Sequence, residues 1–292
     1  MVKSNLKVKK IDSKANLKVV KESTVKTTSY SDINLNAWRE YDHVKTDTLW
    51  EFPNRLKEGG HSNEYHGNYI PQIAQQIYER YTKKDDIVLD LFFGSGTSGI
   101  EAINMNRRCI GVELKDELAE KVSEKFTPKQ LVTDVNIICA DSASELAKEK
   151  IKARLDIMGR KQAQLLMLHP PYDDIIKFSD KKEDLSNCAT TEEFYDLFEK
   201  VAKNGYDLLE KGRFACLIIG DKYANSQHIP LGFECMARMN KLGFITKAII
   251  IKDMQGNERA KGKTANLWRY RALAGGFYIF KHEYVMIFQK VR

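Results

Sequence analysis

The chain has 292 residues, of which 42% are hydrophobic, and a formal net charge of +7. This length can bury a full hydrophobic core, so the composition predicts one globular domain, or one domain with an appendage. No apolar stretch approaches the roughly 20 residues of a membrane span, and no apolar segment follows the first lysines as in a signal peptide. We therefore expect a cytoplasmic protein without membrane contact. The five cysteines are odd in number and widely spaced, which favours reduced thiols over a disulfide framework or a zinc knuckle.

The first 28 residues are strongly basic, with eight lysines against Asp12 and Glu22. A segment so rich in charge and poor in aromatic residues buries too little apolar surface to fold alone. We expect residues 1–29 to form a disordered tail. The tail is either merely solvated, or an arm whose lysines attract polyanions with an affinity that weakens in salt.

Residues 30–292 alternate apolar runs with amphipathic stretches, which predicts a single domain of strands joined by crossover helices. Pro71 opens the first expected helix, which carries Ile73, Ala74, Ile77, Tyr78 and Tyr81 on one face. Strands are expected at 87–91, 109–112, 135–139, 164–168 and 214–219, and helices at 98–105, 115–126, 142–155 and 191–209. The fold class is therefore α/β, with a doubly wound, mostly parallel, Rossmann-like sheet.

The end of the chain departs from this alternation. Residues 244–251 and 284–289 both have the pattern of strands, with no long helix expected between them. We expect these two strands to pair antiparallel at the edge of the sheet. The stretch from about 30 to 65, which includes Trp38 and Trp50, has no assigned place.

A glycine-rich turn follows the first expected strand, with the sequence Asp90-Leu91-Phe92-Phe93-Gly94-Ser95-Gly96-Thr97. Glycines let the backbone approach a ligand, and the helix that follows offers free N–H groups. Gly94, Gly96 and Gly99 also satisfy the dinucleotide fingerprint, and Glu113 stands where a ribose-binding acid is expected. The turn alone therefore leaves a nicotinamide dehydrogenase as an alternative.

A second motif, His169-Pro170-Pro171-Tyr172, follows the expected strand 164–168. Consecutive prolines fix the backbone and remove two N–H donors. A dehydrogenase has no need of such a tetrad at this place.

Together the two motifs resemble those of the DNA amino-methyltransferases that use S-adenosylmethionine. The turn is similar to D-P-F-x-G-S-G-T, with Leu91 in place of proline, and the tetrad is similar to D/N/S-P-P-Y/F. The resemblance covers roughly residues 64–290 and implies methyl transfer to an exocyclic nitrogen of adenine or cytosine, without a covalent enzyme intermediate. The order of the motifs favours adenine. Residues 66–71 also resemble the segment that closes over the cofactor in this family.

The resemblance implies a role for individual residues. The cofactor site would comprise Asp90, Phe92, Gly94, Ser95, Gly96 and Thr97 in the turn, Glu113 at the ribose hydroxyls and Asp141 near the adenine. The catalytic residues would be His169, Pro170, Pro171 and Tyr172. The His169 side chain and the Pro170 carbonyl would accept hydrogen bonds from the base amine, while Tyr172 stacks on the base. The mechanism requires no metal, and the histidines show no ligand spacing.

His169 occupies a position where the family usually has Asp, Asn or Ser. A neutral imidazole accepts one hydrogen bond, whereas an imidazolium accepts none. We therefore expect activity to fall as the pH drops through about 6.5, the ordinary value for histidine. Two alternatives remain: His169 is a packed residue in a protein that no longer catalyses, or the Pro170 carbonyl carries the chemistry.

Base recognition must come from loops, because the 27 residues between Asp141 and His169 leave no room for a recognition domain. Two segments are candidates, 173–189 and 252–280. The second mixes cations, Lys252 among them, with aromatic residues, which suits phosphate contact and base stacking. Its candidate nucleic-acid-binding residues are Lys261, Lys263, Trp268, Arg269 and Arg271. The alternative is a solvated basic loop with its aromatic residues in the core.

The expected substrate is double-stranded DNA, in the setting of restriction-modification. The small recognition loops make a partner endonuclease or recognition subunit plausible, and the protein is expected to be a monomer or homodimer. Two further alternatives are an RNA base methyltransferase and a nucleic-acid-binding module without catalytic activity.

Overall fold

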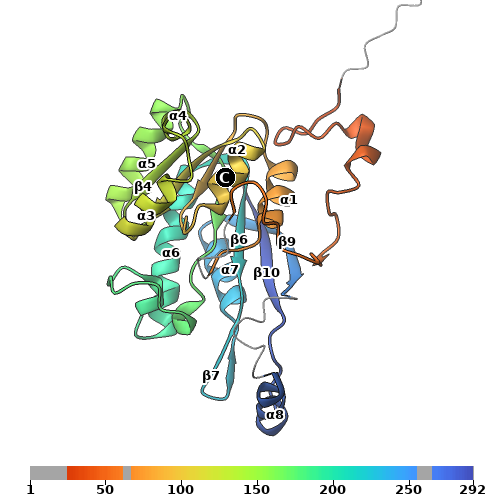
Figure 1. Ribbon diagram of the computed structural model, residues 1–292, viewed down its shortest axis with the longest axis vertical. Coiled ribbons are helices and arrows are strands. Elements are labelled where there is room, and N and C mark those ends of the chain that lie inside the picture. The colour runs from red at the N-terminus through yellow and green to blue at the C-terminus, as the bar shows by residue number, and fades with distance from the viewer. Residues whose placement is uncertain (1–24, 62–66, 255–264, 292) are drawn as a thin grey trace, which may run out of the picture.

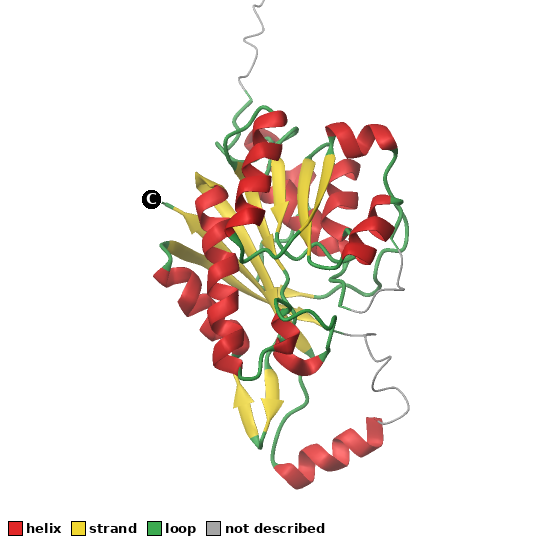
Figure 2. Ribbon diagram, turned by 90° about the vertical axis from the view of Figure 1, so that its left-hand side faces the viewer, coloured by secondary structure: helices red, strands yellow, loops and turns green. Residues whose placement is uncertain are grey.

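The computed structural model describes residues 25–61, 67–254 and 265–291. Most of the expected tail therefore lies outside the described residues, and residues 25–29 carry no helix or strand. One eight-stranded sheet with helices on both faces forms the body of the protein (Figures 1 and 2). Among the helices of the described segments, none has the length and apolar character to span a bilayer.

The elements follow one another in an α/β order for most of the chain. The helices are η1 (Leu35–Tyr41), α1 (Pro71–Tyr81), α2 (Thr97–Asn104), α3 (Asp116–Ser123), α4 (Pro128–Thr133), α5 (Glu145–Ile157), η2 (Asp173–Ile175), η3 (Leu185–Asn187), α6 (Thr191–Leu208), α7 (Leu231–Lys241) and α8 (Ala265–Gly275). The strands are β1 (Leu49–Trp50), β2 (Ile87–Asp90), β3 (Arg108–Glu113), β4 (Val135–Cys139), β5 (Ala163–Leu168), β6 (Leu209–Ile219), β7 (Lys222–Ala224), β8 (Gln227–Ile229), β9 (Phe244–Asp253) and β10 (His282–Lys290).

The sheet has the strand order β1-β9-β10-β6-β5-β2-β3-β4. β10 runs antiparallel to β6 and β9, whereas the other neighbouring strands of this sheet pair in parallel. The chain moves outward from β2 to β4 and then crosses back to β5 on the other side of β2. Doubly wound sheets bind ligands at such a reversal, outside the carboxyl ends of the strands. The expected fold class is confirmed, including the antiparallel pairing of β9 with β10.

The five parallel strands expected from the sequence are all present, and β4 has the expected bounds. β6 begins at Leu209 rather than Phe214, because Leu209 pairs with Ala163 of β5 before a register shift, and the polar residues 210–213 lie within that irregularity. The expectation of no long helix between the last two strands is wrong, since α8 has 11 residues there. α7 and the β7–β8 hairpin, which turns at Asn225 and Ser226 with positive φ at both, were also not anticipated.

Two apolar cores lie on opposite faces of the sheet. α1, α2 and α3 pack on one face and α5, α6 and α7 on the other. Successive residues of a strand enter different cores. Leu89 packs in the core beneath α5, α6 and α7, and Val88 packs in the core beneath α1, α2 and α3. The unplaced N-terminal stretch joins the α1 face, where Trp50 is buried and β1 pairs with β9 at the sheet edge.

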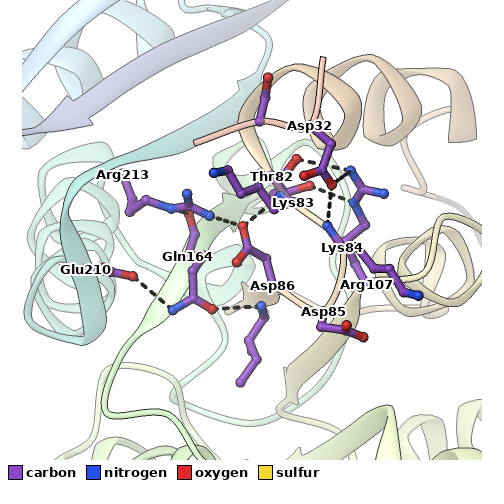
Figure 3. A network of polar contacts seen from close by, with 12 residues as sticks. Asp32, Thr82, Lys83, Lys84, Asp85, Asp86, Arg107, Gln164, Glu210 and Arg213 are labelled. Atoms are coloured by element: carbon purple, nitrogen blue, oxygen red, sulfur yellow. Dashed lines mark hydrogen bonds and ion pairs between the residues drawn. The ribbon is translucent and has the colours of Figure 1, made fainter. Parts of the chain in front are cut away.

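A polar network fixes the amino ends of three central strands (Figure 3). The Arg213 guanidinium binds the Asp86 carboxylate, and both side chains are buried. Gln164 accepts from the Ile87 N–H at 2.9 Å and donates to Glu210 at 3.1 Å. The network therefore ties β2, β5 and β6 together at the edge opposite to their carboxyl ends, where ligands bind in such folds.

Candidate active site

The glycine turn between β2 and α2 is held by the carboxylate of Asp90. This side chain accepts from the Phe92 N–H at 2.9 Å and from the Ser98 hydroxyl at 2.5 Å. Burial raises the pKa of Asp90 to about 6, despite both hydrogen bonds. Gly96 caps α2 at φ +82°, a left-handed conformation that favours glycine. Asp90 thus shapes the turn from behind.

Glu113 ends β3 and reaches back to the same turn. One carboxylate oxygen accepts from the Gly94 N–H and the other from the Lys115 N–H, each at 2.9 Å. Burial raises the pKa of Glu113, while these two hydrogen bonds oppose the shift. Each oxygen keeps a free lone pair, so the carboxylate can still accept two hydroxyl donors.

The tetrad lies beside this turn because β5 pairs directly with β2, with Met167 opposite Asp90. Tyr172 donates its hydroxyl hydrogen to Glu283 at 2.9 Å and lies 3.3 Å from Nε2 of His169. Glu283 in turn forms a buried ion pair with Lys252 at 3.0 Å. Four side chains, two from the tetrad turn and one each from β10 and β9, therefore form one continuous line of contacts.

Burial lowers the pKa of His169 to about 4. Desolvation is the largest cause; Lys252 and Arg55 lower this pKa further, and Glu283 opposes the shift. His169 is therefore neutral, and able to accept a hydrogen bond, over the physiological range. The sequence-based expectation that activity falls near pH 6.5 therefore moves to lower pH, because the value of 6.5 applies to a solvated histidine.

Neighbouring side chains leave the tetrad rings little freedom. The Tyr69 ring meets His169 edge to face, with centroids 5.4 Å apart. On the other side, a Cβ on Gly220 would lie 2.9 Å from the ring of Tyr172. The absence of a side chain at Gly220 thus makes room for Tyr172.

One cavity of about 610 Å³ joins the turn and the tetrad. Of the predicted site residues, it is lined by Phe92, Gly94, Thr97, Glu113, Asp141, His169, Pro170, Pro171 and Tyr172. Asp90, Ser95 and Gly96 do not line it. They belong to the turn behind the wall, where Ser95 is buried and its carbonyl accepts from Lys125 at 2.9 Å.

A family model described as DNA methylase matches residues 3–125 and 163–292. The chain belongs to this DNA methylase family. The nicotinamide alternative left open by the glycine turn is thereby set aside.

Similar curated proteins match parts of the chain. The probable type III restriction-modification enzyme HindVI Mod subunit of Haemophilus influenzae is 34% identical over 33% of this chain and 13% of its own length. DNA adenine methyltransferase YhdJ of Escherichia coli K12 is 31% identical over 41% of this chain and 38% of its own. The chain thus spans well under half of the length of these relatives. Among solved structures, TrmN from Thermus thermophilus aligns at a TM-score of 0.48 with 14% identity, covering 77% of this chain and 50% of that one.

Sequence reasoning did not anticipate Arg55 and Glu283 in this cavity, and it gave Asn68 no individual role. Arg55 and Asn68 line it from the segment before α1, and Glu283 lines it from β10. Arg55 and Glu283 lie far from either motif in sequence, so no spacing signal could have found them. Asn68 falls within the segment 66–71, whose first residue lies outside the described residues.

The predicted recognition segment 252–280 divides into parts with different roles. Lys252 is not a surface cation, because it is buried with Glu283. Lys261 and Lys263 lie outside the described residues. On α8, Arg269 and Arg271 are exposed, and the Arg271 guanidinium lies 5.4 Å from the centre of the Trp268 ring.

α8 and the β7–β8 hairpin extend from the same end of the molecule (Figures 1 and 2). Phe277, just after α8, stacks on Tyr223 of the hairpin with ring centroids 4.7 Å apart. Tyr270 and Tyr278 are largely exposed. Cations and aromatic rings therefore share one surface here.

The other predicted recognition segment, 173–189, is more ordered than a loop. It contains η2 and η3, and Ile175, Ile176 and Phe178 line the cavity. Lys181 pairs with Asp116 at 2.8 Å. The segment therefore forms a wall of the cavity.

Proposed function

We propose that this DNA methylase transfers a methyl group from S-adenosylmethionine to an exocyclic amine of a base in double-stranded DNA, adenine N6 in preference to cytosine N4. One observation carries the proposal: a single cavity contains both the acid-flanked glycine turn and the proline tetrad. The two parts come from neighbouring strands at the point where the strand order reverses. This is the place where doubly wound sheets bind nucleotide-like ligands.

The chemistry of the cavity fits the cofactor. S-adenosylmethionine supplies a methyl group bound to a positively charged sulfur. Glu113 has free lone pairs for the ribose hydroxyls, and Asp141 lies in the cavity wall for the adenine. Arg55 Nε and Asn68 Nδ2 are buried donors without a hydrogen-bond partner in the described structure, and both side chains line the cavity. Buried donors are normally satisfied, so these two indicate an acceptor on a ligand, such as a carboxylate.

The tetrad supplies what a weakly nucleophilic amine needs. Neutral His169 and the Pro170 carbonyl accept hydrogen bonds from the amine, which holds its nitrogen in one direction. The Tyr172 ring offers a stacking surface for a base turned out of the duplex. Base stacking contributes roughly 1–3 kcal/mol, which helps to offset the cost of extruding the base.

The DNA would contact the surface made by α8, the β7–β8 hairpin and the exposed cations Arg269 and Arg271. Lys261, Lys263, Trp268 and the basic tail would add to this contact. We assign catalysis to one domain, residues 30–292, with recognition segments 173–189 and 252–280, acting in the cytoplasm as a monomer or homodimer. The likeness to a type III Mod subunit supports a partner endonuclease or recognition subunit.

The test is incubation of the purified protein with methyl-labelled S-adenosylmethionine and unmodified duplex DNA, with RNA in a parallel reaction. The products are digested to nucleosides and the labelled species identified. Labelled N6-methyldeoxyadenosine supports the full proposal, and labelled N4-methyldeoxycytidine reassigns the base. Label only in RNA replaces DNA by RNA as the substrate. Cofactor binding without label in either would indicate a binding module and contradict the proposed catalysis.

A further inference from the structure

The contacts that connect His169 through Tyr172 and Glu283 to Lys252 have a defined direction of hydrogen bonding. Glu283 and Lys252 face each other as paired residues of β10 and β9, and their side chains are both buried. An ionised carboxylate only accepts hydrogen bonds, so the hydroxyl of Tyr172 must donate its one hydrogen to Glu283. Its oxygen then has only lone pairs to offer to His169.

The imidazole must therefore donate a hydrogen bond from the ring nitrogen nearest to Tyr172. That nitrogen is Nε2, 3.3 Å from the hydroxyl oxygen. A neutral imidazole carries one hydrogen, so a hydrogen on Nε2 leaves Nδ1 with a free lone pair. Within the described residues, no hydrogen bond to Nδ1 is found.

We propose that Glu283 is a positioning residue which acts through Tyr172 to fix His169 as the Nε2–H tautomer, so that Nδ1 is the acceptor presented to the substrate amine. This inference rests on the proposed function for its purpose, but the tautomer itself does not depend on turnover. It also explains how histidine serves at a position where the related motifs have Asp, Asn or Ser. Those side chains offer an acceptor oxygen in any case, whereas histidine offers an acceptor only when its hydrogen is on the other nitrogen.

Lys252 sets the direction of hydrogen bonding between Glu283, Tyr172 and His169. A buried carboxylate beside a cation is held in its charged form. A protonated carboxyl at this place could donate to Tyr172, which would then donate to Nε2 and drive the hydrogen of His169 to Nδ1. The acceptor would be lost without any change in the shape of the cavity. The charged groups around His169 are thus Glu283, Lys252 and Arg55.

The tautomer can be read directly by NMR of protein labelled with ¹⁵N-histidine, with His169 assigned by its loss in His169→Asn. At pH 7 we expect one slowly exchanging ring hydrogen, on Nε2. In Tyr172→Phe, which keeps the ring, this hydrogen should exchange at least about tenfold faster. In Glu283→Gln the introduced amide can donate to Tyr172, and the ring nitrogens should shift towards the Nδ1–H form.

Tyr284→Phe is the matched control. Tyr284 is the next residue on β10 and also donates to a buried carboxylate, that of Asp221 at 2.9 Å, outside the tetrad. It should leave the His169 signals unchanged. If Glu283→Gln fails to fold, Lys252→Met tests the same direction of hydrogen bonding by removing the cation beside Glu283.

Kinetics provide an independent second measurement. We expect Glu283→Gln to lower kcat at least about tenfold, since an imidazole held in the wrong tautomer loses its function in other enzymes by up to about 10⁴-fold, while the cofactor Kd changes less than about twofold. A wild-type His169 with its hydrogen on Nδ1 overturns the inference, as do unchanged nitrogen shifts and exchange in both Tyr172→Phe and Glu283→Gln. Failure of the proposed function would instead show as absent methylation with the Nε2–H pattern intact.

Discussion

Tyr69 and His169 pack edge to face, with ring centroids 5.4 Å apart and an interplanar angle of 86°. The hydroxyl of Tyr69 also lies 2.5 Å from Ser98 Oγ, which donates to Asp90. The carboxylate that shapes the glycine turn is therefore connected, through two side chains, to the ring that begins the tetrad. The glycine turn and the tetrad, which line one cavity, share this support.

Two replacements of Tyr69 should distinguish the contribution of its ring from that of its hydroxyl. Tyr69→Leu removes the aromatic edge beside His169, and we expect kcat to fall about tenfold because the imidazole loses its fixed orientation. Tyr69→Phe keeps the ring and loses one buried hydrogen bond, at a cost of about 1 kcal/mol in stability. Its kcat should stay within about twofold of the wild type. Methylation rates and urea unfolding of both variants measure the two effects, and equal loss of kcat in both would count against the ring contact.

The rate of methylation should be nearly flat from pH 8 to 5.5 as far as His169 is concerned. Its pKa of about 4 keeps the imidazole neutral in this range. His169→Asn, whose amide oxygen accepts at any pH, should have the same profile there. A wild-type decline centred near pH 6.5 that disappears in His169→Asn would show that the histidine is solvated in the working enzyme.

The same low pKa makes His169 a source of acid instability. The unfolded chain, with a histidine pKa near 6.5, binds this proton before the folded chain does, so stability falls as the pH drops from 6.5 towards 4. Between pH 7.5 and 5 the loss is about 2 kcal/mol. The thermal midpoint should therefore fall several degrees further in the wild type than in His169→Asn over this interval. Asp90 is present in both proteins, so its own raised pKa cancels in the comparison.

Removal of the Glu113 carboxylate should weaken cofactor binding. Hydrogen bonds to a charged group contribute about 1.5–3 kcal/mol, so Glu113→Ala should raise the cofactor Kd at least about tenfold by calorimetry. Asp116→Asn, at an exposed position on α3, is the control and should leave Kd unchanged. Unaltered binding in Glu113→Ala would remove this residue from the cofactor site.

A methyl group at Gly220 should displace Tyr172. The added Cβ would meet the Tyr172 ring at 2.9 Å, closer than carbon atoms normally approach. We expect Gly220→Ala to lower kcat about tenfold or more, because the stacking surface and the hydroxyl both move. Cofactor affinity serves as the internal control and should be retained, since the turn follows β2, which is separated from β6 by β5. Loss of both together would point to general misfolding.

The exposed arginines of α8 should contribute to DNA binding through phosphate. Arg269→Ala with Arg271→Ala should weaken binding to all sequences alike and reduce the slope of log K against log salt by about 2. Lys211→Ala with Lys129→Ala, at exposed positions outside α8 and the hairpin, should leave the slope unchanged. A salt titration of binding to duplexes of different sequence distinguishes the two results.

Sequence reasoning recovered those parts of the fold whose signals are local. The strands from β2 to β6 are short apolar runs, and the turn and tetrad are contiguous motifs, so each could be recognised by itself. Lys252 was assigned to a basic surface because its neighbours in sequence are charged. Its partner, Glu283, is 31 residues away and meets it only because β9 pairs with β10. α8 was missed because it lacks the one-sided apolar pattern of a helix that packs on a sheet.

β10 lies between β6 and β9, although it follows both in the chain. Glu283 therefore reaches Tyr172 only after a later strand has entered the gap between two earlier ones. During synthesis, the turn and the tetrad can fold beside each other well before the imidazole receives its orientation. Cofactor binding and base methylation should accordingly appear at different times as the protein emerges from the ribosome.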